Sequence, residues 1–171
     1  MGLFTKDIQT FDDLFVSTLQ TTYYAERRIA EKLPKMREKA TSPDLKMGFE
    51  QHQRETEMQI DRLERVFRMH GTEPSESTCP AIDGILKAGE SLAGDIADKD
   101  VLDAALTGAA QMVEHYEIAQ YGTMIAWAQE MGRQDCASLL AETLAEEKAT
   151  DEKLTRLAEA RLNARAEMQS A

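Results

Sequence analysis

Cysteine, proline and long hydrophobic runs are scarce in this chain of 171 residues. Its two cysteines, Cys79 and Cys136, are too few for a disulfide scaffold and lack the spacing of zinc ligands. Four prolines and no long β-branched runs argue against a sheet-based fold. No apolar stretch is long enough to span a bilayer, and the N-terminus lacks a secretory signal pattern. We therefore expect a cytoplasmic protein with no membrane partner.

Basic residues are in the minority, with 20 Lys and Arg against 31 Asp and Glu and a net charge of −11. Nucleic-acid binding needs a basic footprint, so this balance argues against nucleic-acid partners. The abundant residues are instead good helix formers such as Ala, Leu, Glu, Lys and Met. A chain of this length suits one domain with a real core. We expect residues 1–171 to form a single all-α domain.

Apolar residues recur every three or four positions along four long segments, which is the spacing of amphipathic helices. Turn signals place these helices at about residues 7–39, 43–70, 99–131 and 134–164. Ser42 before Pro43 is typical of a helix start, and Gly71 and Gly132 are natural helix ends. Residues 71–98 form a crossover that contains a short helix interrupted by glycines.

The lengths of the connections indicate a ferritin-like four-helix bundle. Short turns make the first and second, and the third and fourth, long helices antiparallel hairpins. The crossover is long enough to return the length of the bundle, which makes the second and third long helices parallel. An up-down-up-down bundle would need only a short loop there.

Several carboxylates occupy apolar helix faces, where acids are uncommon. They are Glu26 on the first helix, Glu55 on the second, Glu114 and Glu117 on the third, and Glu147 and Asp151 on the fourth. Residues equidistant from a hairpin turn lie at the same level. The sequence midpoints are 40.5 for Glu26 and Glu55, 132 for Glu117 and Glu147, and 132.5 for Glu114 and Asp151. All three midpoints fall at predicted turns, so the acids should meet.

Carboxylates gathered in a core cannot all remain charged, because burying even one costs several kcal/mol, of order, without compensation. They can protonate, pair with cations or bind metal. Two divalent ions would offset four charges, and carboxylates suit iron or manganese, with zinc as an alternative. Chance placement is the competing explanation for any single acid, since Glu55 can pair with Arg62 or Arg54, and Glu147 with Lys148. Four acids at matching levels on four helices favour a dinuclear metal site.

Four segments around these acids resemble the YciE/YciF family of bacterial stress-response proteins, in the ferritin-like superfamily alongside rubrerythrins. They are "AERRIAEKLPKM", "FEQHQRETEMQIDRLERVF", "EHYEIAQYGT" and "EEKATDEKLT". The resemblance covers nearly the whole chain, starting from "FDDLF". It implies a helical bundle, dimerisation and a stress association, but no established reaction.

The rubrerythrin-like pattern has Glu-x-x-His on the second and fourth helices, and this chain departs from it there. Met58 and Thr150 stand where the histidines would be. Other side chains on these stripes could substitute as ligands or hydrogen-bond to them: His52, Gln59, Asp151 and Tyr121. The rest of the pattern is present, as Glu26 on the first helix and as Glu114 with Glu117 on the third.

Two functions remain open at this point. The first is a dinuclear, carboxylate-bound metal protein, with iron foremost, in which the reduced site reacts with peroxide or oxygen. The second is a structural or interaction protein that keeps the bundle without turnover. We also expect a homodimer, because Phe4, Phe11 and the short helix at about 81–97 offer more apolar surface than a closed bundle needs.

Overall fold

The structure, a computed structural model, describes residues 8–168. Its elements, in order, are α1 (Phe11–Lys39), α2 (Pro43–His70), α3 (Pro80–Asp95), α4 (Lys99–Glu130), α5 (Gln134–Leu157), a π-helical turn η1 (Ala158–Leu162) and α6 (Asn163–Met168). No strand occurs within residues 8–168. The all-α prediction is therefore confirmed.

Helix α1 begins later than the sequence pattern indicated. Thr10 caps it by accepting a 3.0 Å hydrogen bond from the Asp13 amide, while Asp13 accepts one of 3.1 Å from the Thr10 amide. This reciprocal arrangement is a capping box and fixes the first helical residue as Phe11. Asp7, near which we placed the start, lies outside the described residues.

The other helix ends follow from their local sequences. Ser42 caps α2 by accepting from the Leu45 amide at 3.4 Å. Gly71 and Gly132 adopt φ values of +87° and +71°, a left-handed conformation that favours glycine. At the far end, α5 does not run unbroken to residue 164. It passes through η1, where Leu162 is buried, before α6 continues to Met168.

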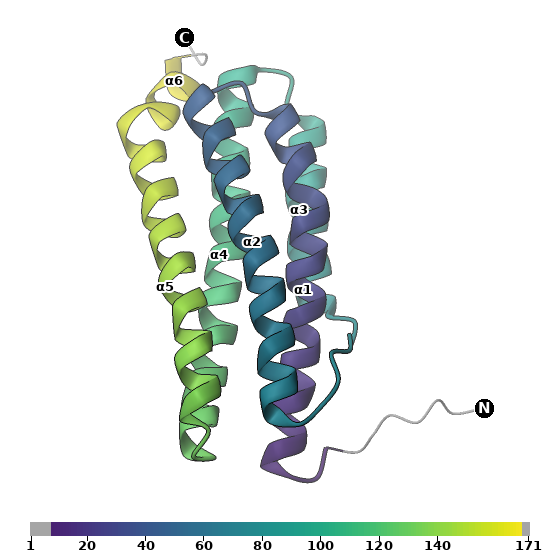
Figure 1. Ribbon diagram of the computed structural model, residues 1–171. Helices are drawn as coiled ribbons and strands as arrows, with labels where there is room; N and C mark the ends of the chain where they lie inside the picture. Colours follow the sequence, from purple (N-terminus) through teal and green to yellow (C-terminus); the bar gives the residue numbers. More distant parts are fainter. Residues whose placement is uncertain (1–7, 169–171) are drawn as a thin grey trace, which may run out of the picture.

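The helices run lengthwise along one bundle (Figure 1). Helix α1 ascends, α2 descends beside it, and the crossover with α3 returns up the bundle so that α4 descends and α5 ascends. Helix α1 packs against α2 and α4, and α5 packs against the same two helices. Since α2 and α4 point the same way, the connectivity is ferritin-like, as predicted.

The apolar core is divided into two clusters. One lies toward the α1–α2 turn and includes Leu33, Phe49, Leu106 and Leu154. The other lies toward the opposite end and includes Phe15, Leu19, Phe67, Tyr121 and Leu140. Between these clusters lie buried polar residues from all four long helices, among them Glu26, His52, Glu117 and Glu147. The bundle therefore holds a polar layer between two apolar ones.

Helix α3 packs on α4 and α1 and contributes to the apolar cluster that lies toward the α1–α2 turn. Its Ile82 and Leu86 are buried within the chain, whereas Leu92 remains 50% exposed. The ring of Phe11, 42% exposed, contacts Trp127 edge-on with a centroid distance of 5.7 Å. Among the described residues, none of the helices has the length and apolarity needed to cross a bilayer.

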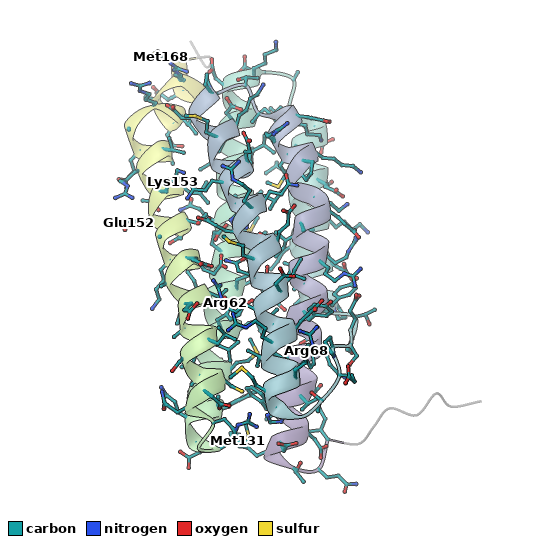
Figure 2. All side chains as sticks on the ribbon, viewed as in Figure 1. Arg62, Arg68, Met131, Glu152, Lys153 and Met168 are labelled. Carbon is teal, nitrogen blue, oxygen red and sulfur yellow. The ribbon has the colours of Figure 1, made fainter. Side chains whose placement is uncertain are left out.

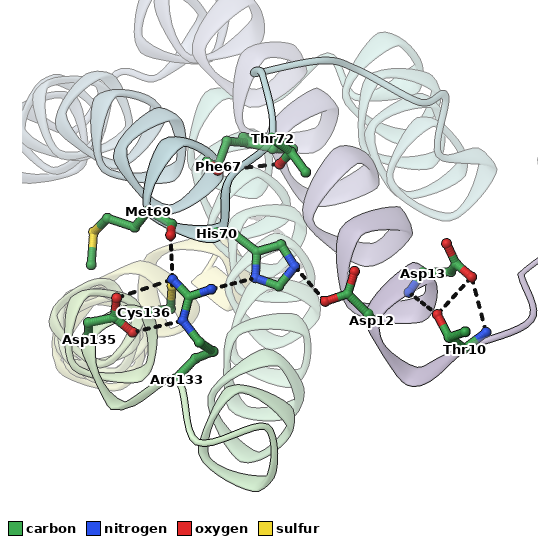
Figure 3. A network of polar contacts seen from close by, with 10 residues as sticks. All are labelled: Thr10, Asp12, Asp13, Phe67, Met69, His70, Thr72, Arg133, Asp135 and Cys136. Atoms are coloured by element: carbon green, nitrogen blue, oxygen red, sulfur yellow. Dashed lines mark hydrogen bonds and ion pairs between the residues drawn. The ribbon is translucent and has the colours of Figure 1, made fainter.

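The lower end of the bundle is tied together by a network around Arg133 and His70 (Figure 3). Arg133 hydrogen-bonds to the Met69 carbonyl and forms an ion pair with Asp135 at 3.2 Å. The ring of His70 lies between Arg133, at 3.4 Å from Nδ1, and Asp12, at 2.9 Å from Nε2. These contacts join α1, α2 and the start of α5. They therefore help to fix how the three helices are aligned along the bundle axis.

Candidate metal centre

The polar layer receives at least one side chain from each long helix. They are Glu26 from α1, His52 from α2, Glu114 and Glu117 from α4, and Glu147 from α5. None is more than 4% exposed, and Glu26 is fully buried. Four helices therefore direct four acids and one imidazole into one closed space.

The register of α2 explains why it contributes a histidine. Apart from Phe67, its buried residues repeat at alternating intervals of four and three: Leu45, Phe49, His52, Thr56, Gln59, Leu63 and Val66. That spacing keeps one stripe facing the bundle axis. His52 lies on this stripe. Glu55 immediately precedes the stripe residue Thr56, so its side chain is turned away from the axis and toward α5.

The side chains of the layer are close enough to share ions. One ligand atom each from His52, Glu114, Glu117 and Glu147 can be chosen so that all lie within 4.8 Å of one another. His52 Nδ1 is 3.1 Å from Glu114 Oε1. Glu26 lies beside Glu117 in the same layer, and the Tyr121 hydroxyl donates to Glu26 Oε1.

Burial raises the pKa of every acid in the layer. The pKa of Glu26 rises to about 7, although its hydrogen bond from Tyr121 and the nearby His52 act in the opposite direction. The pKa of Glu114 rises to about 8, with a lowering contribution from its hydrogen bond with Glu147. The pKa values of Glu117 and Glu147 are held well above the usual range by burial and by the neighbouring carboxylates.

These shifts define two acid pairs, Glu26 with Glu117 and Glu114 with Glu147. The members of each pair lie close enough for each to shift the pKa of the other. In the metal-free protein these acids therefore hold on to protons at a pH where free carboxyl groups have lost them. Ionising all four acids together requires positive charge in the layer.

The acids also have unused acceptor atoms. Within residues 8–168, five buried carboxylate oxygens receive no hydrogen bond from the protein: Glu26 Oε2, Glu114 Oε2, Glu117 Oε1 and Oε2, and Glu147 Oε1. The amide oxygen of Gln59 is buried and unpaired in the same way. Buried oxygens are normally hydrogen-bonded. A set of carboxylates with one imidazole suits iron, manganese or zinc, so the residues present fit a bound cation.

The remaining sequence candidates lie at the edge of the layer. Glu55 is partly exposed and accepts hydrogen bonds from Gln51 at 2.7 Å and Thr150 at 3.5 Å. The side chain of Asp151 is 22% exposed and lies 3.3 Å from the exposed His115. Gln59 is buried, and its amide nitrogen donates to Glu146 at 3.0 Å. The structure does not bring Glu55 or Asp151 into the central group.

Arg62 and Asp103 are two polar residues whose place the sequence pattern did not reveal. Arg62 of α2 (Figure 2) pairs with Glu146 of α5 at 2.9 Å and donates to Thr143 at 2.6 Å. Asp103 of α4 is buried and accepts three hydrogen bonds from Thr41 and Ser42 at the α1–α2 turn. Both groups fix the alignment of the helices around the acids.

A narrow cavity approaches the layer from one side. Its volume is about 30 Å³, close to that of one water molecule. Glu55 and Lys153 line its outer part, and His52 and Glu114 line its inner part. The His52–Glu114 edge is therefore the side of the layer accessible to a small molecule or ion.

A helical bundle with an internal layer of acids defines a ferritin-like protein, and comparison with known families specifies which one. Residues 10–167 match the family described as a domain of unknown function, DUF892. The chain belongs to this family. It is 38% identical over 162 residues to Protein YciF of Escherichia coli K12, covering 94% of this chain and 98% of YciF. The resemblance to the YciE/YciF family is thus confirmed.

Solved structures agree with this assignment. The crystal structure of YciF, described as an E. coli stress protein, matches with a TM-score of 0.87 at 38% identity, covering 91% of this chain and 99% of YciF. YcfI of Rhodopseudomonas palustris, for which a structural role has been suggested, matches with a TM-score of 0.87 at 52% identity, covering 90% and 98%. A Xanthomonas campestris protein, XCC3681, shares the fold at 23% identity, with a TM-score of 0.74 and coverage of 95% and 100%.

Proposed function

We propose that this protein binds a dinuclear metal centre, with iron foremost and manganese or zinc as alternatives, in the bacterial stress response. The observation that carries the proposal is the group of five buried carboxylate oxygens without a protein donor. Leaving ionised acids unpaired in a core is costly, whereas two divalent ions offset four negative charges. Protein YciF of E. coli, a relative of this chain, has a solved structure described as that of a stress protein.

The residues that would hold the ions are His52 and the four buried glutamates: Glu26, Glu114, Glu117 and Glu147. A reduced metal pair, when bound, supplies electrons for the reduction of peroxide or oxygen. Tyr121 fixes the orientation of Glu26 through its hydroxyl. The apolar clusters on both sides exclude bulk water. Glu55 and Asp151 would reach an ion only by turning inward from the edge.

The alternative is a structural protein whose metal site does not turn over. It is favoured by the single imidazole in the layer, since the rubrerythrin-like pattern has two histidines, and by the structural role suggested for YcfI. Anaerobic titration with ferrous ion, followed by peroxide, separates the two functions. Rapid oxidation of the bound iron supports an enzyme, whereas binding without oxidation supports the structural role.

A homodimer in the cytoplasm, with no nucleic-acid partner, completes the proposal. Phe11 and Leu92 are apolar side chains that the chain leaves 42% and 50% exposed, while Phe4, which contributed to the expectation, lies outside the described residues. The two-fold arrangement common among homodimers could cover such side chains. Sedimentation equilibrium at micromolar concentration tests this directly, because a mass equal to the 19.2 kDa chain would contradict it.

A further inference from the structure

A second cavity lies outside the polar layer, between α1, α3 and α4. Its volume is about 170 Å³. Its floor and walls are mostly apolar, formed by Met36, Ile85, Leu86, Leu106 and Val113. Small residues leave the space open, since Gly89, Ala93 and Ala109 also line it. A cavity of about 150 Å³ can accommodate a benzene-sized apolar group, so this one has room for a hydrocarbon group of six to eight carbons, approximately.

The mouth of this cavity carries positive charge in an otherwise acidic protein. Lys32, Lys35 and Lys39 line it from α1, and Glu90 is the one acid among the lining residues. Three lysines against one glutamate give a local net charge of +2, compared with −11 for the whole chain. Lys32 is paired with Glu90 at 2.5 Å. Within residues 8–168, Lys35 and Lys39 have no ion pair shorter than 4.0 Å. They act on the Glu90 carboxylate only at longer range, where they help to lower its pKa, so neither ammonium group is held by a direct partner.

We propose that this cavity binds a small amphiphilic carboxylate, with its hydrocarbon group among the apolar walls and its carboxylate between Lys35 and Lys39. Charge complementarity selects the anion, since an apolar amine would meet like charge at the mouth. The volume selects a short ligand over a long-chain lipid. The occupant is a free carboxylate rather than a lipid head group, because a membrane surface would also meet the acidic remainder of the chain.

This cavity adjoins the narrow one that reaches the metal centre. Lys32, Met36, Leu86 and Val113 line both. The bound carboxylate would therefore lie beside the open edge of the polar layer without contacting its acids, none of which lines the larger cavity. Carboxylate binding needs no metal. The test of this cavity can therefore fail while metal binding in the polar layer is confirmed, and metal binding can fail while the carboxylate binds.

Octanoate is a suitable probe, titrated into the full-length metal-free protein by calorimetry and by ligand-observed NMR. We expect saturable binding with a dissociation constant of about 1 mM or tighter. Octanol, which lacks the charge, should bind at least about fivefold more weakly, and octylammonium should not bind. Absence of saturable octanoate binding in the millimolar range, or equal affinity for octanol, would overturn the proposal.

Two variants test the location of binding. Lys35→Gln with Lys39→Gln should weaken octanoate binding about fivefold or more, since both ammonium groups are lost. A control of equal charge change is Lys46→Gln with Lys87→Gln, two exposed lysines outside the cavity, which should leave the affinity unchanged. Ala93→Leu should fill the cavity and weaken binding at least about tenfold, with circular dichroism confirming that the variant is folded. Equal affinity in the lysine variant and its control would contradict the proposed site.

Discussion

Asp103 and Glu117 are both buried acids of α4, each 1% exposed, yet their surroundings differ completely. Asp103 accepts three hydrogen bonds of 2.7 Å each, from the amide and hydroxyl of Thr41 and from the amide of Ser42. Glu117 receives no protein hydrogen bond at either oxygen and faces three further acids. Burial alone therefore does not identify a functional acid. The distinguishing property is acceptor capacity that the protein leaves unused.

The largest expected effect on stability is at Asp103, the acid whose oxygens are hydrogen-bonded by the protein. Asp103→Ala should lower the free energy of unfolding by about 3 kcal/mol, because it removes three hydrogen bonds at the α1–α2 turn and leaves the buried Ser42 amide without an acceptor. Urea unfolding of the metal-free protein measures this. Asp61→Ala, at an exposed position of α2, is the control and should leave stability unchanged. A loss below about 1 kcal/mol for the Asp103 variant would mean that the turn does not depend on it.

The pH dependence of stability sharpens the contrast. The pKa values of Glu26 and Glu114 rise from an ordinary 4.5 to about 7 and about 8 in the folded protein, so the folded state binds more protons than the unfolded state. Stability is then greatest near the unfolded values and declines as the pH rises through the folded ones. We expect the metal-free protein to lose at least about 2 kcal/mol between pH 5.5 and 9, which is the contribution of Glu26 alone. Bound metal should flatten this decline, and urea unfolding at a series of pH values tests both statements.

Replacement of Glu117 by Gln should have the opposite sign from the Asp103 variant. It removes one ionisable carboxyl group from the crowded layer and replaces it with an amide of similar size, so fewer acids compete for ionisation there. We expect the metal-free variant to gain about 1–2 kcal/mol at pH 8 and to bind metal more weakly. Glu26→Gln should behave similarly. Glu55→Gln is the matched control, and it should change both quantities little, because that carboxylate already accepts two hydrogen bonds at the edge.

The smallest effect concerns the hydroxyl that orients Glu26. Tyr121→Phe removes the hydrogen bond to Glu26 Oε1 but keeps the ring in the apolar cluster that includes Phe15 and Phe67. Thermal unfolding of the metal-free variant should show a loss of about 1 kcal/mol or less. Metal affinity should fall by about tenfold, the lower end of the range for residues that orient ligands. Unchanged affinity would remove Tyr121 from the account of the centre.

The sequence predicted most of the architecture because hydrophobic spacing and turn residues carry it directly. The bundle and its connectivity follow from those patterns, whereas the family was recognised from the resemblance of four segments to known relatives. Helix starts were less exact, since a capping box at Thr10 and Asp13 lies within a stretch that also reads as helical. The π-helical turn at Ala158–Leu162 has no residue signature of its own that we recognise.

The polar layer was harder to predict than the fold, because one residue of register changes which side chain faces inward. Glu26, Glu114, Glu117 and Glu147 lie on unbroken apolar stripes, and the structure buries them. On α2, the four-and-three spacing from Leu45 to Val66 selects His52 over Glu55, but only when the whole helix is aligned. Asp103 lies on an equally apolar stripe, and no pattern in the sequence shows that Thr41 and Ser42 will satisfy it.

The stoichiometry of metal binding tests the central claim most directly. Anaerobic calorimetry with ferrous ion, on protein stripped of metal, counts the ions bound per chain for the wild type and for Glu117→Gln. The account predicts two ions per chain, release of protons from the raised-pKa acids on binding, and weaker binding in the variant. No binding, or binding of the same strength and stoichiometry in Glu117→Gln, would contradict a metal centre in the polar layer.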